Sequence, residues 1–247
     1  MNKEFSGNVV IVIGATGGIG AATGTLFAER GATVIMASRS GDTDLADGLQ
    51  KKGLQAESRR VDARREQDVN NMVRHVLKRF GRIDILVNSQ AVNQCRLLEN
   101  IALRDWNNVL ATNITSMFLT CKACLPHMKK RRAGKIINIS SVAARNRSPV
   151  SGVHYVASKA AVLGFTRQLA FEVAPFGINV NAICPGQTMT PMLLESMTPL
   201  QRRRLADSIP LRRIAEPEEQ AAVIAFLASD AARYMSGAIV DVNGGQI

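Results

Sequence analysis

Short apolar runs alternate with longer amphipathic stretches from one end of the chain to the other. Several of the short runs are almost continuously apolar (VVIVI, TVIMA and IDILV), which is typical of strands covered on both faces. Helical spacing of apolar residues is clearest in Glu66–Phe80, Thr115–Arg131 and Tyr155–Ala174. The predicted strands are Asn8–Ile13, Ala32–Ala37, Gln55–Val61, Ile83–Asn88, Lys135–Ser140, Ile178–Cys184 and Ala238–Val242.

The repeated strand–helix order predicts an α/β fold. Successive βα units form a parallel sheet through right-handed crossovers, with helices on both faces. No internal repeat, low-complexity tract or linker divides the sequence. We therefore expect residues 1–247 to form a single doubly wound domain of about seven strands, with ligands bound at the carboxyl ends of the strands. The loops expected to carry the site are 14–20, 38–44, 62–65, 89–100, 141–154 and 185–214.

Composition and charge narrow the possible functions. Apolar residues make up 46% of the chain and charged residues 21%, as in ordinary globular proteins. The net charge is +11, but only 4% of residues are aromatic, which argues against a protein that stacks nucleic-acid bases on rings. Residues 5–28 are uncharged, yet their continuous apolar run, Val9–Ile13, is too short for a signal sequence or a bilayer span. Four cysteines in 247 residues indicate free thiols and a cytoplasmic protein.

A glycine-rich turn follows the first predicted strand and opens a helix. Its sequence is Gly14-Ala-Thr-Gly17-Gly18-Ile-Gly20. Glycines allow the backbone to turn tightly and to approach a pyrophosphate, whose charge is favoured at the amino end of a helix. The position of this turn in the first βα unit predicts a dinucleotide site rather than a plain strand–helix connection. The expected cofactor contacts here are Gly14, Thr16, Gly17, Gly18, Ile19 and Gly20.

Tyr155 and Lys159 lie four residues apart on a predicted helix, so both side chains project from one face. The ordinary pKa of a tyrosine, about 10, is too high for proton exchange at neutral pH. A nearby lysine ammonium and an oxidised nicotinamide would lower that pKa, as a general acid or base requires. Such a pair also occurs by chance on helix surfaces, but Ser141 precedes it and Asn113 lies in a helix that begins near Trp106. The combination predicts a catalytic set.

These motifs together resemble the short-chain dehydrogenase/reductase family. The glycine spacing is Gly-x-x-x-Gly-x-Gly, Asn88-Ser-Gln-Ala91 follows the fourth predicted strand, and Val242-Asn-Gly-Gly245 closes the chain. The resemblance extends over nearly all residues. It implies a Rossmann-like fold and an NAD(P)-dependent oxidoreductase that interconverts a ketone and a secondary alcohol by hydride transfer.

The resemblance also implies a role for each catalytic residue. Tyr155 transfers the proton to or from the reacting oxygen, and Ser141 hydrogen-bonds the same oxygen. Lys159 holds the nicotinamide ribose, and Asn113 fixes a water that links Lys159 to solvent. Ser140 is the alternative to Ser141, although the family pattern points to the second serine.

The corner after the second predicted strand distinguishes the two nicotinamide cofactors. It contains Ser38 and Arg39, which can bind the 2′-phosphate of NADP, and no carboxylate for the 2′-hydroxyl of NAD, because Asp42 comes later. NADP is therefore predicted, and NAD is the alternative if Arg39 only stacks on adenine. The resemblance places Asp62 at the adenine amino group. It implies further cofactor contacts at Asn88, Pro185, Gly186, Thr188 and Thr190.

Three positions depart from the family pattern. Ile13 replaces a threonine, Ser89-Gln90-Ala91 replaces Asn-Ala-Gly, and Asn243 replaces an aspartate. None of these changes removes a catalytic group. They bear on cofactor affinity rather than on activity.

Several arginines lie in the loops expected to face the substrate. They predict an anionic substrate, but solvent-exposed surface charge explains their presence equally well. They are Arg96, Arg145, Arg147, Arg202, Arg203 and Arg204. The chain is similar to 3-oxoacyl-[acyl-carrier-protein] reductases, which implies a thioester on a carrier protein or on CoA. Of the two basic residues that would meet the carrier, one is Arg131 or Arg132, and the other position holds Phe171.

Other functions remain alternatives. Related enzymes include NAD-dependent dehydrogenases of sugars, polyols or small secondary alcohols. A non-catalytic cofactor sensor or nucleic-acid-binding regulator is a different class, against which the retained Tyr155–Lys159 pair argues. We expect neither a nucleic-acid nor a membrane partner.

The resemblance implies a homotetramer. The methionines of residues 186–214 suit a mobile cover over the substrate.

Cys121-x-x-Cys124-x-x-His127 has metal-like spacing, but no second cysteine pair or histidine cluster completes it. No metal site is predicted.

Overall fold

The computed structural model describes residues 3–247. Seven strands form one parallel sheet in the order β3-β2-β1-β4-β5-β6-β7. The strands are β1 (Val9–Ile13), β2 (Thr33–Ser38), β3 (Ala56–Arg60), β4 (Ile85–Asn88), β5 (Gly134–Ile139), β6 (Ile178–Pro185) and β7 (Ile239–Val242). All seven were predicted from the sequence, with ends that differ by one or two residues.

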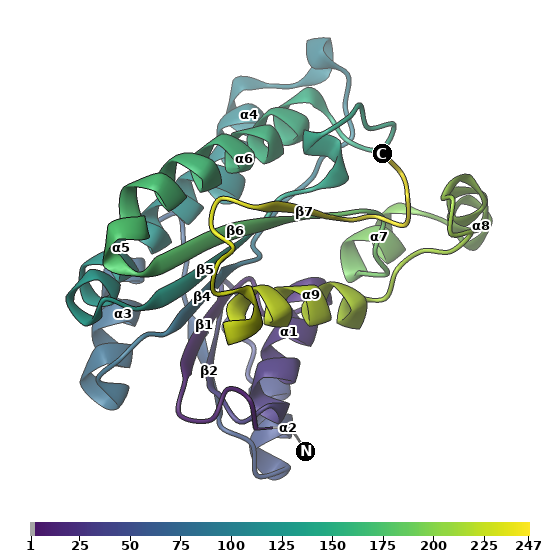
Figure 1. The fold of residues 1–247 in the computed structure, drawn as a ribbon. Helices are drawn as coiled ribbons and strands as arrows, with labels where there is room; N and C mark the ends of the chain where they lie inside the picture. Colours follow the sequence, from purple (N-terminus) through teal and green to yellow (C-terminus); the bar gives the residue numbers. More distant parts are fainter. Residues whose placement is uncertain (1–2) are drawn as a thin grey trace.

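Helices cover both faces of the sheet (Figure 1). One layer holds α1 (Gly18–Glu29), α2 (Asp44–Lys51) and α9 (Pro217–Ala228); the other holds α3 (Glu66–Phe80), α4 (Leu103–Leu110), α5 (Ser116–Arg131) and α6 (Val153–Val173). Single tighter turns occur at Leu98–Asn100, Val142–Ala144, Ala174–Phe176 and Asp230–Ala232.

The apolar run of β1 explains the two layers. Val9, Ile11 and Ile13 pack in the core cluster that includes α3, α5 and α6. Val10 and Val12 pack in the cluster that includes α1, α2 and α9. Because alternate side chains of a strand point to opposite faces, a strand buried on both sides must be apolar throughout.

A wider, π-type turn interrupts the predicted helix around Asn113. The α4 helix ends at Leu110, residues Ala111–Thr115 form the wide turn, and α5 begins at Ser116. The expectation of a continuous helix from Trp106 to Asn113 is therefore wrong by a few residues. Such turns insert an extra residue and re-aim a side chain, and they occur often at functional sites.

A small substructure follows β6 and projects from the sheet (Figure 1). It contains α7 (Pro191–Ser196) and α8 (Pro199–Ser208), which share a separate apolar cluster of Leu193, Ile209 and Ile214. Among residues 3–247, no helix combines the length and the apolar character needed to cross a bilayer.

A buried carboxylate fastens the start of β4 to its neighbours. Asp84 accepts hydrogen bonds from the Val9 N–H at 2.8 Å, from two nitrogens of Arg82 and from Arg131 Nη1 at 2.8 Å. Burial by itself would raise the pKa of Asp84, but these hydrogen bonds outweigh it and hold the pKa below 3.8. The carboxylate is therefore ionised in the folded protein near neutral pH.

Candidate active site

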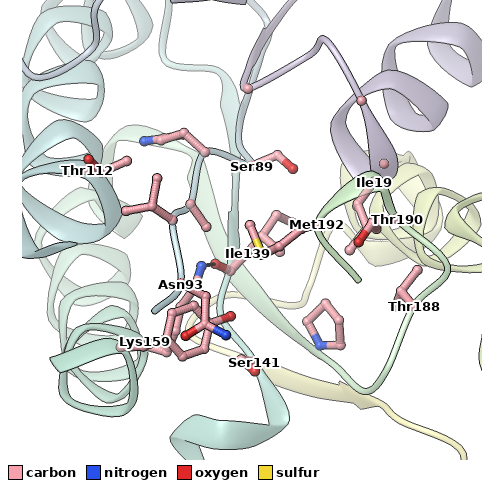
Figure 2. Close-up of a pocket in the computed structure, with 18 of the residues that line it drawn as sticks. Ile19, Ser89, Asn93, Thr112, Ile139, Ser141, Lys159, Thr188, Thr190 and Met192 are labelled. Atoms are coloured by element: carbon pink, nitrogen blue, oxygen red, sulfur yellow. Dashed lines mark hydrogen bonds between the residues drawn. The ribbon is translucent and has the colours of Figure 1, made fainter. Parts of the chain in front are cut away.

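One cavity of about 440 Å³ opens at the carboxyl ends of the strands (Figure 2). Its walls come from the loops after β1, β2, β3, β4, β5 and β6 and from the start of α7. This is the edge at which the sequence predicted a ligand site. It extends from the glycine-rich turn past Tyr155 and Lys159 to Met192 and Met197.

The glycine-rich turn forms a cradle that side chains would fill. Gly14 has a φ of +83°, and a Cβ there would lie 2.8 Å from the Cα of Gln90. Gly18 has a φ of +52°, and its Cβ would lie 2.7 Å from Thr190 Cγ2. The first residues of α1 line the cavity, so their backbone N–H groups suit a pyrophosphate. Gly14, Thr16, Gly17, Gly18 and Ile19 line the cavity; Gly20 lies behind them, buried against the Gly14 carbonyl.

The corner after β2 carries hydroxyl groups and cations. Ser38 Oγ accepts a hydrogen bond from the Gly41 N–H at 3.0 Å and lies 3.3 Å from Ser40 Oγ. Arg39 lines the cavity and makes no ion pair with the residues that the structure describes. The Asp42 carboxylate accepts the Asp44 N–H at 3.0 Å and so caps the start of α2.

Arg60 adds a cation to this corner that sequence reasoning missed. Parallel pairing of β2 and β3 places Arg60 beside Ser38. A Cβ on Gly41 would lie 2.6 Å from the Arg60 Cβ, so the arginine stem packs against the loop. Arg59 points to the other face, where it pairs with Glu57 at 3.6 Å. Only the pairing of the two strands brings Arg60 to the corner.

Asp62 lies at the neighbouring end of the cavity, where the resemblance predicts adenine. Both of its carboxylate oxygens accept hydrogen bonds from Arg64, at 2.8 and 2.6 Å. These bonds lower the pKa of Asp62 to about 2, against an opposing effect of burial. Arg64 also donates to Asn108 Oδ1, which fixes its guanidinium plane on the cavity wall. No motif in the sequence pointed to this arginine.

Ser141, Tyr155 and Lys159 all line the cavity wall, and Figure 2 shows Ser141 and Lys159 there. Tyr155 and Lys159 project from one face of α6, as their spacing predicts, and Lys159 Nζ lies 5.8 Å from the centre of the Tyr155 ring. Lys159 is buried and donates to the Ile139 carbonyl at 2.8 Å. Ser141 Oγ accepts the Ala143 N–H at 3.1 Å. Ser140, the alternative, donates its hydroxyl to the Lys159 carbonyl instead.

Burial and a neighbouring hydroxyl set the pKa of Tyr155 among the protein's own groups. Burial raises it above 10, and the Ser141 hydroxyl offsets only part of that shift. Burial also lowers the pKa of Lys159 to about 8, against an opposing influence of Cys184. The sequence-based expectation combines Lys159 with a bound oxidised nicotinamide, so a lowered pKa of Tyr155 in the presence of the cofactor stays a prediction.

Two predicted residues support the cavity without lining it. Asn113 Oδ1 accepts the Val92 N–H at 2.8 Å, and its Nδ2 donates to the Val92 carbonyl and to Ser158 Oγ. Asn88 hydrogen-bonds Asn138 and Thr120 inside the sheet layer. Both side chains are fully buried, so they position neighbouring backbone.

The segment after β6 closes one side of the cavity. Pro185, Gly186, Thr188 and Thr190 all line it. Thr190 also caps α7 by accepting the Leu193 N–H at 3.4 Å. Figure 2 shows Thr188, Thr190 and Met192 facing the glycine-rich turn.

Half of the six arginines expected to attract an anionic substrate have partners within the protein. Arg96 pairs with Asp105 at 3.0 Å, Arg145 pairs with Asp241 at 3.2 Å, and Arg202 donates to the Met197 carbonyl at 2.7 Å. Arg147, Arg203 and Arg204 remain exposed and without an ion pair among residues 3–247. The predicted basic rim is reduced to these three.

The cysteines of the metal-like motif are core residues. Cys121 and Cys124 are buried, and burial raises the pKa of the Cys121 thiol to about 12 and that of Cys124 still higher. Within residues 3–247, no three His, Cys, Asp or Glu side chains are grouped as metal ligands would be.

Known proteins resemble this chain over nearly its whole length. Residues 14–246 match a protein-family model described as enoyl-(acyl carrier protein) reductase. The 3-oxoacyl-[acyl-carrier-protein] reductase FabG of Thermotoga maritima is 37% identical over 248 residues, which is 99% of each chain. The crystal structure of gox2181 superposes with a TM-score of 0.95 at 33% identity, covering 99% of this chain and 97% of that one. A Brucella melitensis 3-oxoacyl-[acyl-carrier protein] reductase with bound NAD has a TM-score of 0.90 at 30% identity, covering 100% and 94%.

Proposed function

Because the chain belongs to the short-chain dehydrogenase/reductase family, we propose that its cavity binds NADP(H) and that it works as a ketone reductase. Family membership makes it an NAD(P)-dependent oxidoreductase that interconverts a ketone and a secondary alcohol. The observation that carries the proposal is that one cavity joins the glycine-rich turn, the Ser38–Arg39 corner and the Ser141–Tyr155–Lys159 set. The unit that does this is the whole of residues 1–247, with residues 186–214 as its cover.

The corner after β2 supports NADP over NAD. Ser38 and Arg39 supply a hydroxyl and a cation on the cavity wall for a 2′-phosphate, and Arg60 is a second cation whose stem lies beside Ser38 on the next strand. Asp42 lies beyond Ser38 and Arg39 and does not line the cavity, so no carboxylate stands at the place of a 2′-hydroxyl. The adenine lies against the fixed guanidinium of Arg64, while Asp62 holds that guanidinium in place. Gly14, Gly17 and Gly18 cradle the pyrophosphate.

The catalytic groups divide the work of proton transfer. Tyr155 donates its phenolic proton to the carbonyl oxygen in reduction, and the raised pKa of Tyr155 keeps that proton in place until it is needed. Ser141 hydrogen-bonds the same oxygen and stabilises the charge that develops on it. Lys159 binds the nicotinamide ribose from its buried position. When bound, the reduced nicotinamide supplies the hydride for the carbonyl carbon.

Titration of the protein with NADPH and NADH, followed by nicotinamide fluorescence, tests the cofactor assignment. We expect NADPH to bind more tightly, and Arg39→Ala or Arg60→Ala to weaken NADPH by about 10- to 100-fold with little effect on NADH. Arg59→Ala is the matched control, because Arg59 lies on the same strand but faces Glu57. Equal affinity for the two cofactors in the unaltered protein would refute the assignment.

Two substrate classes follow from different observations. The names of the relatives favour a 3-oxoacyl thioester. Against docking of a carrier protein, Arg131 is held by Asp84, Arg132 donates to the Pro175 carbonyl, and Phe171 is 78% exposed where a second cation is needed. These contacts favour a compact ketone that needs no docking surface. Turnover of acetoacetyl-CoA, an acyl-carrier thioester and small ketones under the same conditions decides between the classes.

We also propose a cytoplasmic homotetramer. The four cysteines form no disulfide among the described residues, which suits a reducing compartment. Leu103 on α4 and Phe118 on α5 are 74% and 46% exposed, near the helix faces through which relatives in the family assemble. Light scattering on a sizing column measures the mass, and a monomer at micromolar concentration would contradict the proposal.

A further inference from the structure

The side chain of Asn93 is held in one orientation on the cavity wall. Its Nδ2 donates to the Val150 carbonyl at 3.0 Å and to Ser151 Oγ at 3.3 Å. A reversed amide would set Oδ1 against the Val150 carbonyl, an unfavourable contact between two acceptors. The Val150 carbonyl therefore fixes which way the amide points.

The backbone around Asn93 is fastened on both sides. Val92 is bound through its N–H and its carbonyl by the buried Asn113. The Gln94 carbonyl accepts the Gly152 N–H at 2.9 Å, and the Gly152 carbonyl accepts the Tyr155 N–H at 3.1 Å. Asn93 is thus tied to the start of the helix that carries the catalytic tyrosine, so its position relative to the reacting atoms is fixed.

The other polar atom of the amide has no partner. Asn93 Oδ1 is buried and finds no hydrogen-bond donor among the residues that the structure describes, yet Asn93 lines the cavity. Figure 2 shows it on the side of the cavity that carries Lys159 and Ser141. A buried acceptor without a donor in the wall of a cavity disfavours an apolar ligand and favours a ligand that reaches it with an O–H or N–H donor.

The surrounding wall is also partly polar. Ser148, Ser151, Gln187 and Ser196 line the cavity beside Val142, Val150, Met192 and Met197. A long hydrocarbon chain would bury these hydroxyl and amide groups against methylenes. A small molecule with its own hydroxyl groups would not.

We propose that Asn93 Oδ1 accepts a hydrogen bond from a hydroxyl group that the substrate carries on the carbon next to the reacting carbonyl. The substrate is then a compact hydroxyketone and the product a vicinal diol: a hydride adds to the carbonyl carbon, Tyr155 gives the proton to its oxygen, and the neighbouring hydroxyl is unchanged. This inference rests on the proposed ketone reduction and selects the compact of its two substrate classes.

A matched pair of ketones tests the inference. We would measure kcat/KM for 1-hydroxy-2-butanone and 2-butanone with NADPH, in the unaltered protein, in Asn93→Leu and in the control Asn146→Leu, whose side chain is exposed and outside the cavity. The hydroxyketone is expected to be favoured by at least about tenfold. In Asn93→Leu that preference is expected to fall to within about threefold while 2-butanone turnover is retained, which also shows that the variant folds.

The outcomes separate the two proposals. Three outcomes would overturn the role of Asn93 and leave the proposed ketone reductase intact. They are an equal kcat/KM for both ketones in the unaltered protein, a preference for acetoacetyl-CoA over the hydroxyketone, and a preference for the hydroxyketone over 2-butanone that persists in Asn93→Leu and Asn93→Ala. No oxidation of NADPH by any of the three substrates, despite NADPH binding, would overturn the proposed function and this inference with it.

Discussion

Lys159 carries an ammonium group into the protein interior, so replacing it with methionine should change how stability depends on pH. The side chain is 1% exposed, and burial lowers its pKa from 10.5 to about 8. The folded protein therefore binds fewer protons than the unfolded chain between these two values. Stability must then rise with pH across that interval, because deprotonation relieves the buried charge.

The size of the effect follows from the two pKa values. A lowering of about 2.5 units corresponds to roughly 3 kcal/mol between the protonation states. About 2 kcal/mol of it should be regained between about pH 7 and pH 9.5, before the unfolded lysine loses its proton. In Lys159→Met this contribution is absent. The free energy of unfolding of the unaltered protein, relative to the variant, is thus expected to increase by about 2 kcal/mol over that range.

Urea denaturation at half-unit steps of pH measures this difference. The matched control is Lys130→Met, because the Lys130 side chain is exposed on the same protein. Subtracting each variant from the unaltered protein removes the titration of all other groups, and the hydrogen bond from Lys159 to the Ile139 carbonyl adds only a pH-independent offset. A difference between the protein and Lys159→Met that stays constant from pH 7 to pH 9.5 would refute a buried lysine with a depressed pKa.

Three further changes address the chemistry, the sheet and the cofactor cradle. Tyr155→Phe should lower kcat by about 10²- to 10⁴-fold with NADPH affinity retained, and a loss smaller than tenfold would contradict its role as acid. Asp84→Asn should cost about 3 kcal/mol in urea denaturation at pH 7, since it leaves Arg131 unpaired. That cost should shrink as the pH falls below about 4, because the unfolded carboxyl then binds a proton that the native carboxyl, with its lowered pKa, still lacks; a pH-independent cost would argue against this ion pair. In Gly14→Ala the new Cβ would lie 2.8 Å from the Gln90 Cα, and the φ of residue 14, +83°, disfavours a side chain. NADPH should therefore bind at least about tenfold more weakly, and an unchanged affinity in a fluorescence titration would show that the loop can shift.

The sequence determined the elements of this fold and most of its candidate site. Strands such as β1, β2 and β4 were readable because each is a short apolar run, and a run of that kind indicates burial on both faces without reference to any distant residue. The edge strand β3 (AESRR) has no such run. The glycine-rich turn and the Tyr155–Lys159 spacing were readable for the same reason: their geometry is set within one turn of helix or one strand–helix connection.

Only the tertiary structure decided which of the polar residues have partners. Arg145 and Asp241 are 96 residues apart, and their pairing removes a cation that the sequence assigned to the substrate. Arg60 lies beside Ser38 because β3 pairs with β2. The amide nitrogen of Asn93 donates to the Val150 carbonyl, 57 residues away, which leaves Asn93 Oδ1 without a hydrogen-bond donor among the described residues. Hydrogen bonding, desolvation and the resulting pKa values depend on the groups that each side chain contacts in the folded protein. These contacts join residues far apart in the sequence, so no local pattern along the chain predicts them.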